Sequence, residues 1–195
     1  MKNSYDFWKK IWDSKGNSDS KDLLFLDGYD HLGVEFSSRD IVENIIKTLG
    51  ISNGSSILEV GCGCGFLARE LNSNFKFVGV DYSESIIEKH KELFDHEVYT
   101  CESNNLLFED NTFDYVFCYG LFQYLPNNEY AKETISEMCR VSRHGVFIGD
   151  LKNLKTRETH FVFPKAEFSN LGFLFSEAHD IQDGAERYNA FRRFE

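Results

Sequence analysis

The chain has 195 residues, of which 42% are hydrophobic and 15% aromatic. This supplies one sizeable core but is short for two domains, so we expect a single domain over residues 1–195. Acidic residues outnumber basic ones by 32 to 21, giving a formal net charge of -11. Such a field repels a phosphate backbone or an anionic membrane, so we expect neither nucleic acid nor membrane as a partner.

The five cysteines indicate a reducing environment. Their number is odd, and they lie mostly in apolar runs, as Cys118 and Cys139 do. This usage is typical of proteins without structural disulfides. No apolar stretch approaches the roughly 20 residues that span a bilayer, and the N-terminus carries no signal-type apolar core. We therefore expect a cytoplasmic location, while the oligomeric state stays open.

Helical and strand patterns alternate along the chain. A first helix is predicted over 4–13, where Tyr5, Trp8 and Trp12 share one face. The next begins at Ser37 or Ser38 and stops at Gly50. Later helical segments are predicted at 66–71, from Ser83 through Phe94, and from Asn127 or Asn128 through Met138.

Short apolar runs between these helices predict the strands. They cover 56–60, 75–80, 97–101, 113–119 and 145–150, and two antiparallel edge strands follow at 173–181 and 186–194. Alternation of this kind indicates an α/β fold with helices on both faces of a sheet. We predict a Rossmann-like, seven-stranded, mostly parallel sheet with an antiparallel C-terminal edge.

A glycine-rich loop follows the first predicted strand. It reads Ile57-Leu-Glu-Val-Gly61-Cys-Gly63-Cys-Gly65, where alternate glycines permit a sharp turn and leave the backbone open to a ligand. Asp81 comes twenty residues after Gly61, at the end of the next strand, where a carboxylate can accept both hydroxyls of a ribose. Together these features predict a nucleoside-type cofactor site.

Two kinds of nucleoside cofactor compete for this site. A dinucleotide site has Gly-x-Gly-x-x-Gly, but Phe66 stands at the third glycine position. Glu59 precedes the first glycine by two residues, where it would repel a pyrophosphate and attract a cationic amino-acid ligand. This favours S-adenosylmethionine, which carries a sulfonium and an ammonium.

The loop resembles that of the class I S-adenosylmethionine-dependent methyltransferases. The resemblance covers roughly 38–150 and includes Val78-Gly-Val-Asp-Tyr-Ser83 and the segment 101–114. It implies that Glu102 and Ser103 meet the adenine, Asp81 the ribose and Gly61 the methionine moiety, with S-adenosylhomocysteine as product. The cofactor-binding residues expected on this basis are Glu59, Gly61, Cys62, Gly63, Gly65, Asp81, Tyr82, Glu102, Ser103, Asn104 and Tyr119.

The class of the methyl acceptor is inferred mainly by excluding other classes. After the fourth strand the chain reads Cys118-Tyr-Gly-Leu-Phe-Gln-Tyr124, with neither the Asn/Asp-Pro-Pro-aromatic pattern of enzymes that methylate bases nor the paired glutamates of protein-arginine enzymes. The aspartate of metal-dependent catechol-type enzymes is also missing, and Cys62-x-Cys64 lacks a second ligand cluster. We expect a small-molecule acceptor, methylated on oxygen or nitrogen, and no metal.

Acceptor-side residues are expected on both sides of this core. The candidates for catalysis are His31, Tyr124 and His160, and those for substrate binding are Tyr29, Gln123, Lys155 and Arg157. Residues 1–36 would form a lid, 37–150 the cofactor-binding core and 151–195 the acceptor side. The cations of 151–164 suggest an anionic or sugar-type acceptor. Positioning the two reactants would supply much of the rate.

Two other functions stay open. A module that binds S-adenosylmethionine without catalysis would keep the same loop and Asp81. A nicotinamide-dependent oxidoreductase would share the fold, but Phe66 and the lack of a Tyr-x-x-x-Lys hydride relay speak against it.

Overall fold

The computed structural model describes residues 4–29, 37–71, 74–155, 157–178 and 186–194. Its strands form one seven-stranded sheet in the order β3-β2-β1-β4-β5-β7-β6. Neighbouring strands from β3 to β5 are parallel, and β7 is antiparallel to both β5 and β6. The predicted fold class is confirmed. The strands are β1 (Ser56–Val60), β2 (Lys76–Asp81), β3 (Glu97–Thr100), β4 (Phe113–Tyr119), β5 (Ser142–Lys152), β6 (Leu174–Glu177) and β7 (Arg187–Arg193).

Three of the longer helices begin where the sequence offers a capping side chain. Ser37, Ser83 and Asn127 each accept a hydrogen bond from a backbone N–H of the first turn, as N-caps do. Gly50 ends its helix with a left-handed φ of 75°. The α-helices are α1 (Ser4–Gly16), α2 (Leu23–Leu26), α3 (Ser38–Leu49), α4 (Glu84–Leu93), α5 (Asn128–Val141) and α6 (Lys165–Asn170), and the 3-10 turns are η1 (Ala68–Glu70) and η2 (Phe122–Tyr124).

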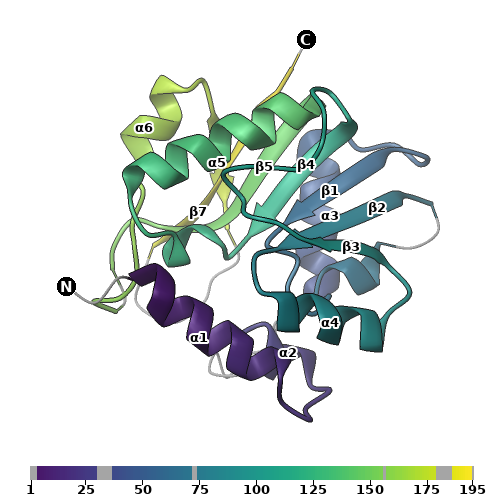
Figure 1. Cartoon of the computed structure of the whole chain (residues 1–195). Coiled ribbons are helices and arrows are strands. Elements are labelled where there is room, and N and C mark those ends of the chain that lie inside the picture. The colour runs from purple at the N-terminus through teal and green to yellow at the C-terminus, as the bar shows by residue number, and fades with distance from the viewer. Residues whose placement is uncertain (1–3, 30–36, 72–73, 156, 179–185, 195) are drawn as a thin grey trace.

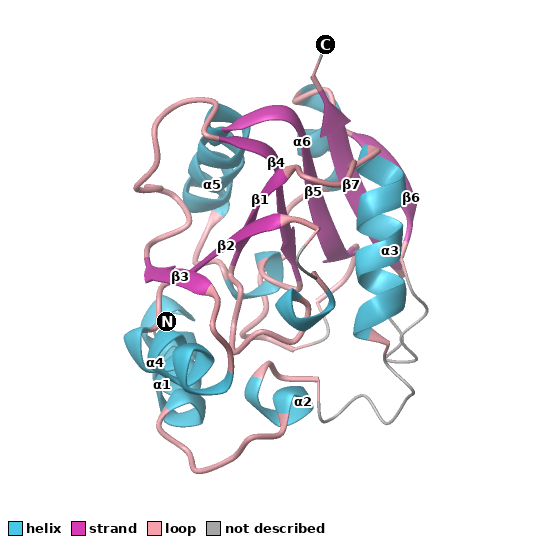
Figure 2. Ribbon diagram, turned by 90° about the vertical axis from the view of Figure 1, so that its right-hand side faces the viewer, coloured by secondary structure: helices cyan, strands magenta, loops and turns pink. Residues whose placement is uncertain are grey.

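Successive residues of the central strands pack into two cores on opposite faces of the sheet. Ile57 of β1 and Phe117 of β4 belong to the core that includes α3. Their neighbours Leu58 and Val116 belong to the core that includes α5. Figure 2 shows α3 and α5 on opposite sides of the sheet. The central strands are therefore buried on both faces, which explains their continuous apolar sequence.

Three segments differ from their predicted form. The helix expected over 66–71 is only the single 3-10 turn η1. The fifth strand is longer than expected and runs over Ser142–Lys152. The last strands are shorter than expected, and residues 179–181 of the first of them lie outside the described residues.

Helix α1 lies near the carboxyl ends of β1, β2 and β4 (Figure 1). The Trp8 indole N–H donates to the Thr159 carbonyl at 3.1 Å, and the Ser83 hydroxyl donates to the Asp13 carboxylate at 2.6 Å. The Tyr5 hydroxyl donates to Glu102. These bonds join α1 to three distant parts of the chain, so the helix is anchored over the edge of the sheet where parallel α/β folds bind ligands.

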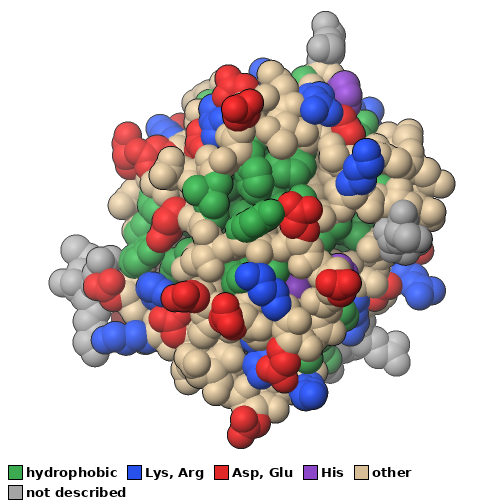
Figure 3. Space-filling model, turned by 45° about the vertical axis from the view of Figure 1, so that its right-hand side comes forward, with side chains coloured by type: hydrophobic (Ala, Val, Ile, Leu, Met, Phe, Trp, Pro, Cys, Tyr) green, Lys and Arg blue, Asp and Glu red, His purple; other side chains and the backbone are tan. Residues whose placement is uncertain are grey.

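The surface mixes charges of both signs. On the face in Figure 3, acidic and basic side chains alternate around a central group of hydrophobic side chains. Within the described ranges, no helix combines the length and apolar character that crossing a bilayer requires.

Candidate functional site

The glycine loop turns away from the end of β1. Gly61 and Gly63 have φ angles of 76° and 53°, in the left-handed region that favours glycine. The backbone N–H groups of Gly61 and Cys62 both donate to the Val80 carbonyl, at 2.7 and 3.0 Å. These bonds hold the loop against the end of β2, so the carboxyl ends of β1 and β2 lie side by side.

A carboxylate that the sequence analysis did not identify holds the loop from the other side. Asp27, at the C-terminal end of α2, accepts hydrogen bonds from the backbone N–H groups of Cys64 at 2.6 Å and Phe66 at 2.9 Å. A Cβ at Gly63 would lie 2.3 Å from the Asp27 Oδ1 atom, so only glycine permits this approach. No local pattern marks Asp27, because the contact joins segments 37 residues apart.

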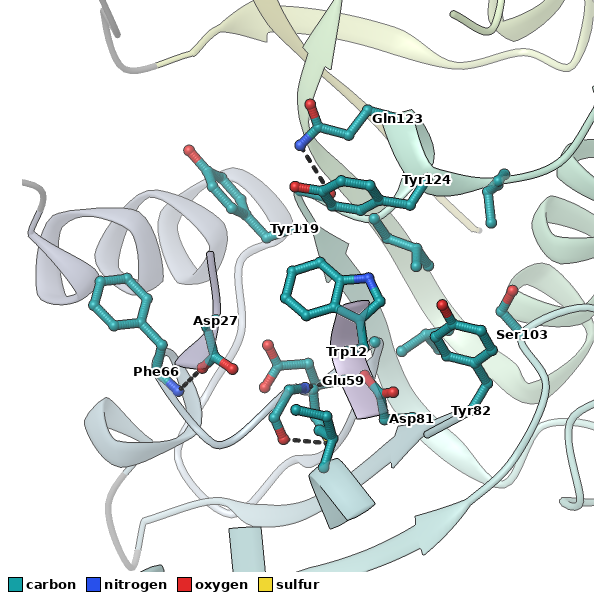
Figure 4. Close-up of a pocket in the computed structure, with 18 of the residues that line it drawn as sticks. Trp12, Asp27, Glu59, Phe66, Asp81, Tyr82, Ser103, Tyr119, Gln123 and Tyr124 are labelled. Atoms are coloured by element: carbon teal, nitrogen blue, oxygen red, sulfur yellow. Dashed lines mark hydrogen bonds between the residues drawn. The ribbon is translucent and has the colours of Figure 1, made fainter. Parts of the chain in front are cut away.

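Two further acids complete a cluster around the loop (Figure 4). Glu59 is 3% exposed, and its Oε2 atom has no hydrogen-bond partner among the described residues. Asp81 accepts hydrogen bonds from the backbone N–H groups of Gly63 at 3.3 Å and Ser83 at 3.0 Å. Burial raises the pKa of Asp81 to about 6 and that of Asp27 to about 7, and it raises the pKa of Glu59 well above its ordinary value. The cluster is therefore suited to a cation, which would favour the charged form of each acid.

These acids line a first cavity of about 970 Å³, its open mouth included. Most of the residues predicted to bind the cofactor lie on its wall. They are Glu59, Gly61, Cys62, Gly63, Asp81, Tyr82, Ser103 and Tyr119. Trp12 of α1 projects into the same space, and Figure 4 shows its indole between the acidic side chains and the pair Gln123 and Tyr124.

Three predicted cofactor residues are not part of this lining. Gly65 lies where a Cβ would press on Phe94 and His90, so this glycine permits close packing with α4. The Glu102 carboxylate accepts hydrogen bonds from the hydroxyls of Tyr5 and Tyr130. The side chain of Asn104 donates to Glu133 at 2.8 Å. The side chains of Glu102 and Asn104 therefore join separate segments of the chain.

A second cavity, of about 780 Å³, adjoins the first. The two share four lining residues, which are Trp12, Tyr29, Gln123 and Tyr124. The predicted acceptor-side residues Arg157 and His160 also line the second cavity, whereas Lys155 is exposed and lines neither cavity. His31 lies outside the described residues.

Aromatic rings form the wall between the two cavities. The Tyr124 ring lies 4.6 Å from that of Trp8, 5.2 Å from that of Trp12 and 5.7 Å from that of His160, measured between centroids. Burial raises the pKa of Tyr124 above its ordinary value, so its hydroxyl keeps its proton near neutral pH. The buried Gln123 Oε1 atom has no hydrogen-bond partner among the described residues. This wall therefore offers both a donor and an acceptor.

The sequence analysis did not identify Lys15, Asp150 or Arg187 as site residues. All three line the second cavity. They come from α1, β5 and β7, and only the pairing of β5 with β7 and the position of α1 bring them together. Each is an ordinary charged residue in the sequence, so no motif could have revealed them.

The comparisons with known proteins agree with this architecture. Residues 57–145 match a family described as "Methyltransferase domain". Demethylmenaquinone methyltransferase of Staphylococcus saprophyticus is 30% identical over 114 residues, covering 54% of this chain and 48% of that protein. Phosphoethanolamine N-methyltransferase of Triticum aestivum is 27% identical over 189 residues, covering 89% and 36%. The chain thus spans about half or less of the length of these two curated relatives.

Solved structures show the same fold. Magnesium protoporphyrin IX methyltransferase of Synechocystis, solved with bound S-adenosylmethionine, has a TM-score of 0.62 and 17% identity, covering 97% of this chain and 92% of that one. Phosphoethanolamine N-methyltransferase 1 of Haemonchus contortus has a TM-score of 0.71 and 13% identity, covering 99% and 50%. The glycine loop, β2 and β4 all lie within residues 57–145. This region is therefore similar to the methyltransferase domain family, and the chain shares the Rossmann-like fold of these solved structures.

Proposed function

We propose that this protein is an S-adenosylmethionine-dependent methyltransferase that moves a methyl group to an oxygen or nitrogen atom of a small molecule. S-adenosylhomocysteine would be the second product. The relatives named above act, by their names, on a demethylmenaquinone, phosphoethanolamine and magnesium protoporphyrin IX, all of them small molecules. The family match over residues 57–145 supports the reaction class.

The observation that carries this proposal is the acidic cluster around the glycine loop. Asp27, Glu59 and Asp81 line the first cavity, and no Lys or Arg is among its described lining residues. Such a cavity repels a pyrophosphate and attracts a cation. S-adenosylmethionine has a sulfonium and an ammonium, whereas a dinucleotide brings negative charge. The residues present therefore fit S-adenosylmethionine better than a nicotinamide cofactor.

Within this cavity each residue has a distinct role. Asp81, at the end of β2, would accept hydrogen bonds from the ribose hydroxyls, and Ser103 would lie at the adenine. Glu59, whose Oε2 atom is buried without a partner among the described residues, would hold the ammonium directly or through water. Gly61 and Gly63 would let the backbone approach the methionine moiety. When bound, the sulfonium supplies an electrophilic methyl group.

The acceptor would enter from the second cavity and meet the wall of Gln123 and Tyr124. Gln123 would accept a hydrogen bond from the attacking O–H or N–H group, and Tyr124, protonated, would donate one. His160 lines the same cavity and is the described candidate for a general base. Tyr29 and Arg157 would contact the body of the acceptor. Alignment of the acceptor at near-attack distance would provide much of the acceleration.

The enclosure of the site supports a role for the N-terminal segment as a lid. Trp12 projects into the first cavity, so α1 must shift or Trp12 must rotate for a large ligand to enter. We also propose a cytoplasmic location, because the five cysteines are all free and four of them are buried.

Ligand-dependent thermal unfolding tests the cofactor, with S-adenosylmethionine, S-adenosylhomocysteine and NADH as separate ligands. A ligand at about 100 times its dissociation constant stabilises by about 2.7 kcal/mol, which raises the Tm by roughly 5–10 °C for a chain of this size. We expect this shift with the two adenosyl ligands and not with NADH. A shift with NADH alone would contradict the proposal. Binding without formation of S-adenosylhomocysteine in the presence of small acceptors would favour a non-catalytic module.

A further inference from the structure

The two adjoining cavities carry opposite charge. The charged side chains on the described lining of the first cavity are Asp27, Glu59 and Asp81, which are all acidic. The described lining of the second cavity contains four cations and one carboxylate, which are Lys15, Lys152, Arg157, Arg187 and Asp150. The chain as a whole has a net charge of -11, so this cationic group runs against its average field. Such a local reversal needs a specific explanation.

The cations approach the wall shared by the two cavities. Arg157 and Arg187 both lie close enough to Tyr124 to lower its pKa, against the larger effect of burial. Lys15 lies 5.2 Å from the centre of the Trp12 ring and donates to the Phe25 carbonyl. Three of the positive charges therefore lie near Tyr124 or Trp12, which belong to both cavities.

Two of these cations lie on interior strands of the sheet, Lys152 at the end of β5 and Arg187 at the start of β7, at the edge where the carboxyl ends of the parallel strands meet. The Lys152 residue is 8% exposed and the Arg187 side chain 4% exposed, and Arg187 forms an ion pair with Asp150. A guanidinium has five N–H donors, so pairing with one carboxylate is compatible with binding a second anion.

The backbone at Asp150 supports a functional role for this edge. Asp150 has a φ of 58°, a left-handed conformation that is uncommon for residues other than glycine. The backbone N–H of Asp150 donates a hydrogen bond to the Asn189 side-chain oxygen at 3.2 Å. This bond lies next to a register shift between β5 and β7. Strained backbone of this kind clusters at ligand sites. Here it sets the position of the carboxylate that pairs with Arg187.

From this arrangement we infer that the second cavity binds the oxyanion of the methyl acceptor, a phosphate or a carboxylate, through Lys152, Arg157 and Arg187. The inference rests on the proposed function and names its substrate class. An acceptor bound in this way places its anionic end among the cations and its nucleophilic end at Gln123. The acidic first cavity excludes the anionic end, so charge alone orients the molecule.

Tryptophan fluorescence offers a direct test, because the protein has two tryptophans and both Trp8 and Trp12 line the second cavity. The full chain is titrated with inorganic phosphate and, separately, with acetate, at ionic strength held constant with sodium chloride. We expect a saturable change with at least one of the two anions. Stronger binding of phosphate would indicate a phosphate ester, and stronger binding of acetate a carboxylate.

Substitutions then test the residues. K152M removes a buried cation and should weaken binding of that anion about tenfold, and R157Q, at an exposed position, about threefold. K10Q removes an exposed charge of α1 outside the lining and should leave binding unchanged. If K152M fails to fold, the comparison of anion affinity between R157Q and K10Q still tests the inference. Loss of affinity to the same extent in R157Q and K10Q would overturn the inference, because it would indicate a general effect of charge.

Calorimetry with S-adenosylhomocysteine on the same samples separates this inference from the proposed function. A protein that binds S-adenosylhomocysteine but shows no saturable response to either anion overturns the inference alone. A protein that binds phosphate or acetate in the second cavity but neither adenosyl ligand overturns the proposed function. It would also remove the identification of the anion as part of a methyl acceptor.

Discussion

The two cavities are assembled in different ways. Two of the three acids of the first cavity and its glycine loop lie at the ends of β1 and β2, because Glu59, the loop and Asp81 fall within 23 residues of sequence. The second takes its cations from α1, β5, the following loop and β7, over a span of more than 170 residues. A site formed by one strand-loop-strand unit leaves a motif in the sequence, whereas a site formed by packing distant elements leaves none.

The largest effect is expected at Asp81, which would bind the ribose. D81N removes the charge and should weaken binding of S-adenosylhomocysteine about 100-fold, since a hydrogen bond to a charged group contributes about 1.5–3 kcal/mol. Calorimetry measures the affinity. D40N, at an exposed position of α3, is the matched control and should bind normally. Normal affinity in D81N would show that the ligand of the first cavity does not use this carboxylate.

Asp27 tests whether a residue from outside the motif matters as much as the motif does. D27N leaves one of the two backbone N–H groups, of Cys64 or Phe66, facing an amide donor, because an amide has only one oxygen. An unsatisfied buried group costs about 1–3 kcal/mol. We expect the Tm to fall by roughly 2–10 °C and the affinity for S-adenosylhomocysteine to fall about 30-fold.

A matched control exists on the same short helix. Asp22 caps α2 by accepting a hydrogen bond from the Leu24 N–H at 3.0 Å, and asparagine is an equally good N-cap. D22N should therefore change neither the Tm nor the affinity. If D27N behaved like D22N, the hydrogen bonds between Asp27 and the glycine loop would have no role in ligand binding.

Proton linkage distinguishes the acidic cavity from the basic one. The pKa values of Asp81, about 6, and Asp27, about 7, are raised above the ordinary value of 3.8, so these groups destabilise the free protein as pH rises from about 4 to about 7. A bound cation favours the ionised form of these acids, so the ligand-bound protein does not lose stability in the same way. The affinity for S-adenosylmethionine should therefore rise about tenfold from pH 5 to pH 7.

The matching measurement is the ligand-induced Tm shift, which should be larger at pH 7 than at pH 5. D27N should flatten the upper part of this pH dependence, because it removes the group with the higher pKa. An affinity that falls with rising pH would contradict a cationic ligand in the first cavity.

The smallest effect is expected where α1 is attached. Y5F removes the hydrogen bond from α1 to Glu102, while Y99F removes the exposed bond between Tyr99 and Glu97 on one strand. Y5F should lower the Tm by about 2–4 °C and change the affinity for S-adenosylhomocysteine less than about threefold. Y99F should change neither, and equal effects of the two would show that the attachment of α1 is not specific.

The fold was predictable because its signals are local. Ser37, Ser83 and Asn127 mark helix starts whatever surrounds them, since each caps a helix through its own first turn. The alternation of strands and helices follows from apolar patterning along the chain. The helix expected at 66–71 was wrong in extent, because only Ala68–Glu70 form a helical turn, of the 3-10 type.

The candidate site was predictable only where it follows the same strands. Gly61, Gly63 and Asp81 line the first cavity, and their contacts with a cofactor stay a prediction. The position of Glu102 at the adenine stays a prediction; in the structure its carboxylate accepts hydrogen bonds from Tyr5 and Tyr130. A position within a motif places a backbone, and the side chain then takes the partners that packing supplies.

The sequence by itself determined the order of the elements, the glycine loop and the acid at the end of β2, because each depends on residues close together in the chain. Only the tertiary structure decided that Asp27 accepts hydrogen bonds from the glycine loop. It also decided that Lys15, Asp150 and Arg187 all line the second cavity. The physical reason is that charge and hydrogen bonding act through space. Residues far apart in sequence have no shared pattern until packing of the sheet and α1 places them side by side.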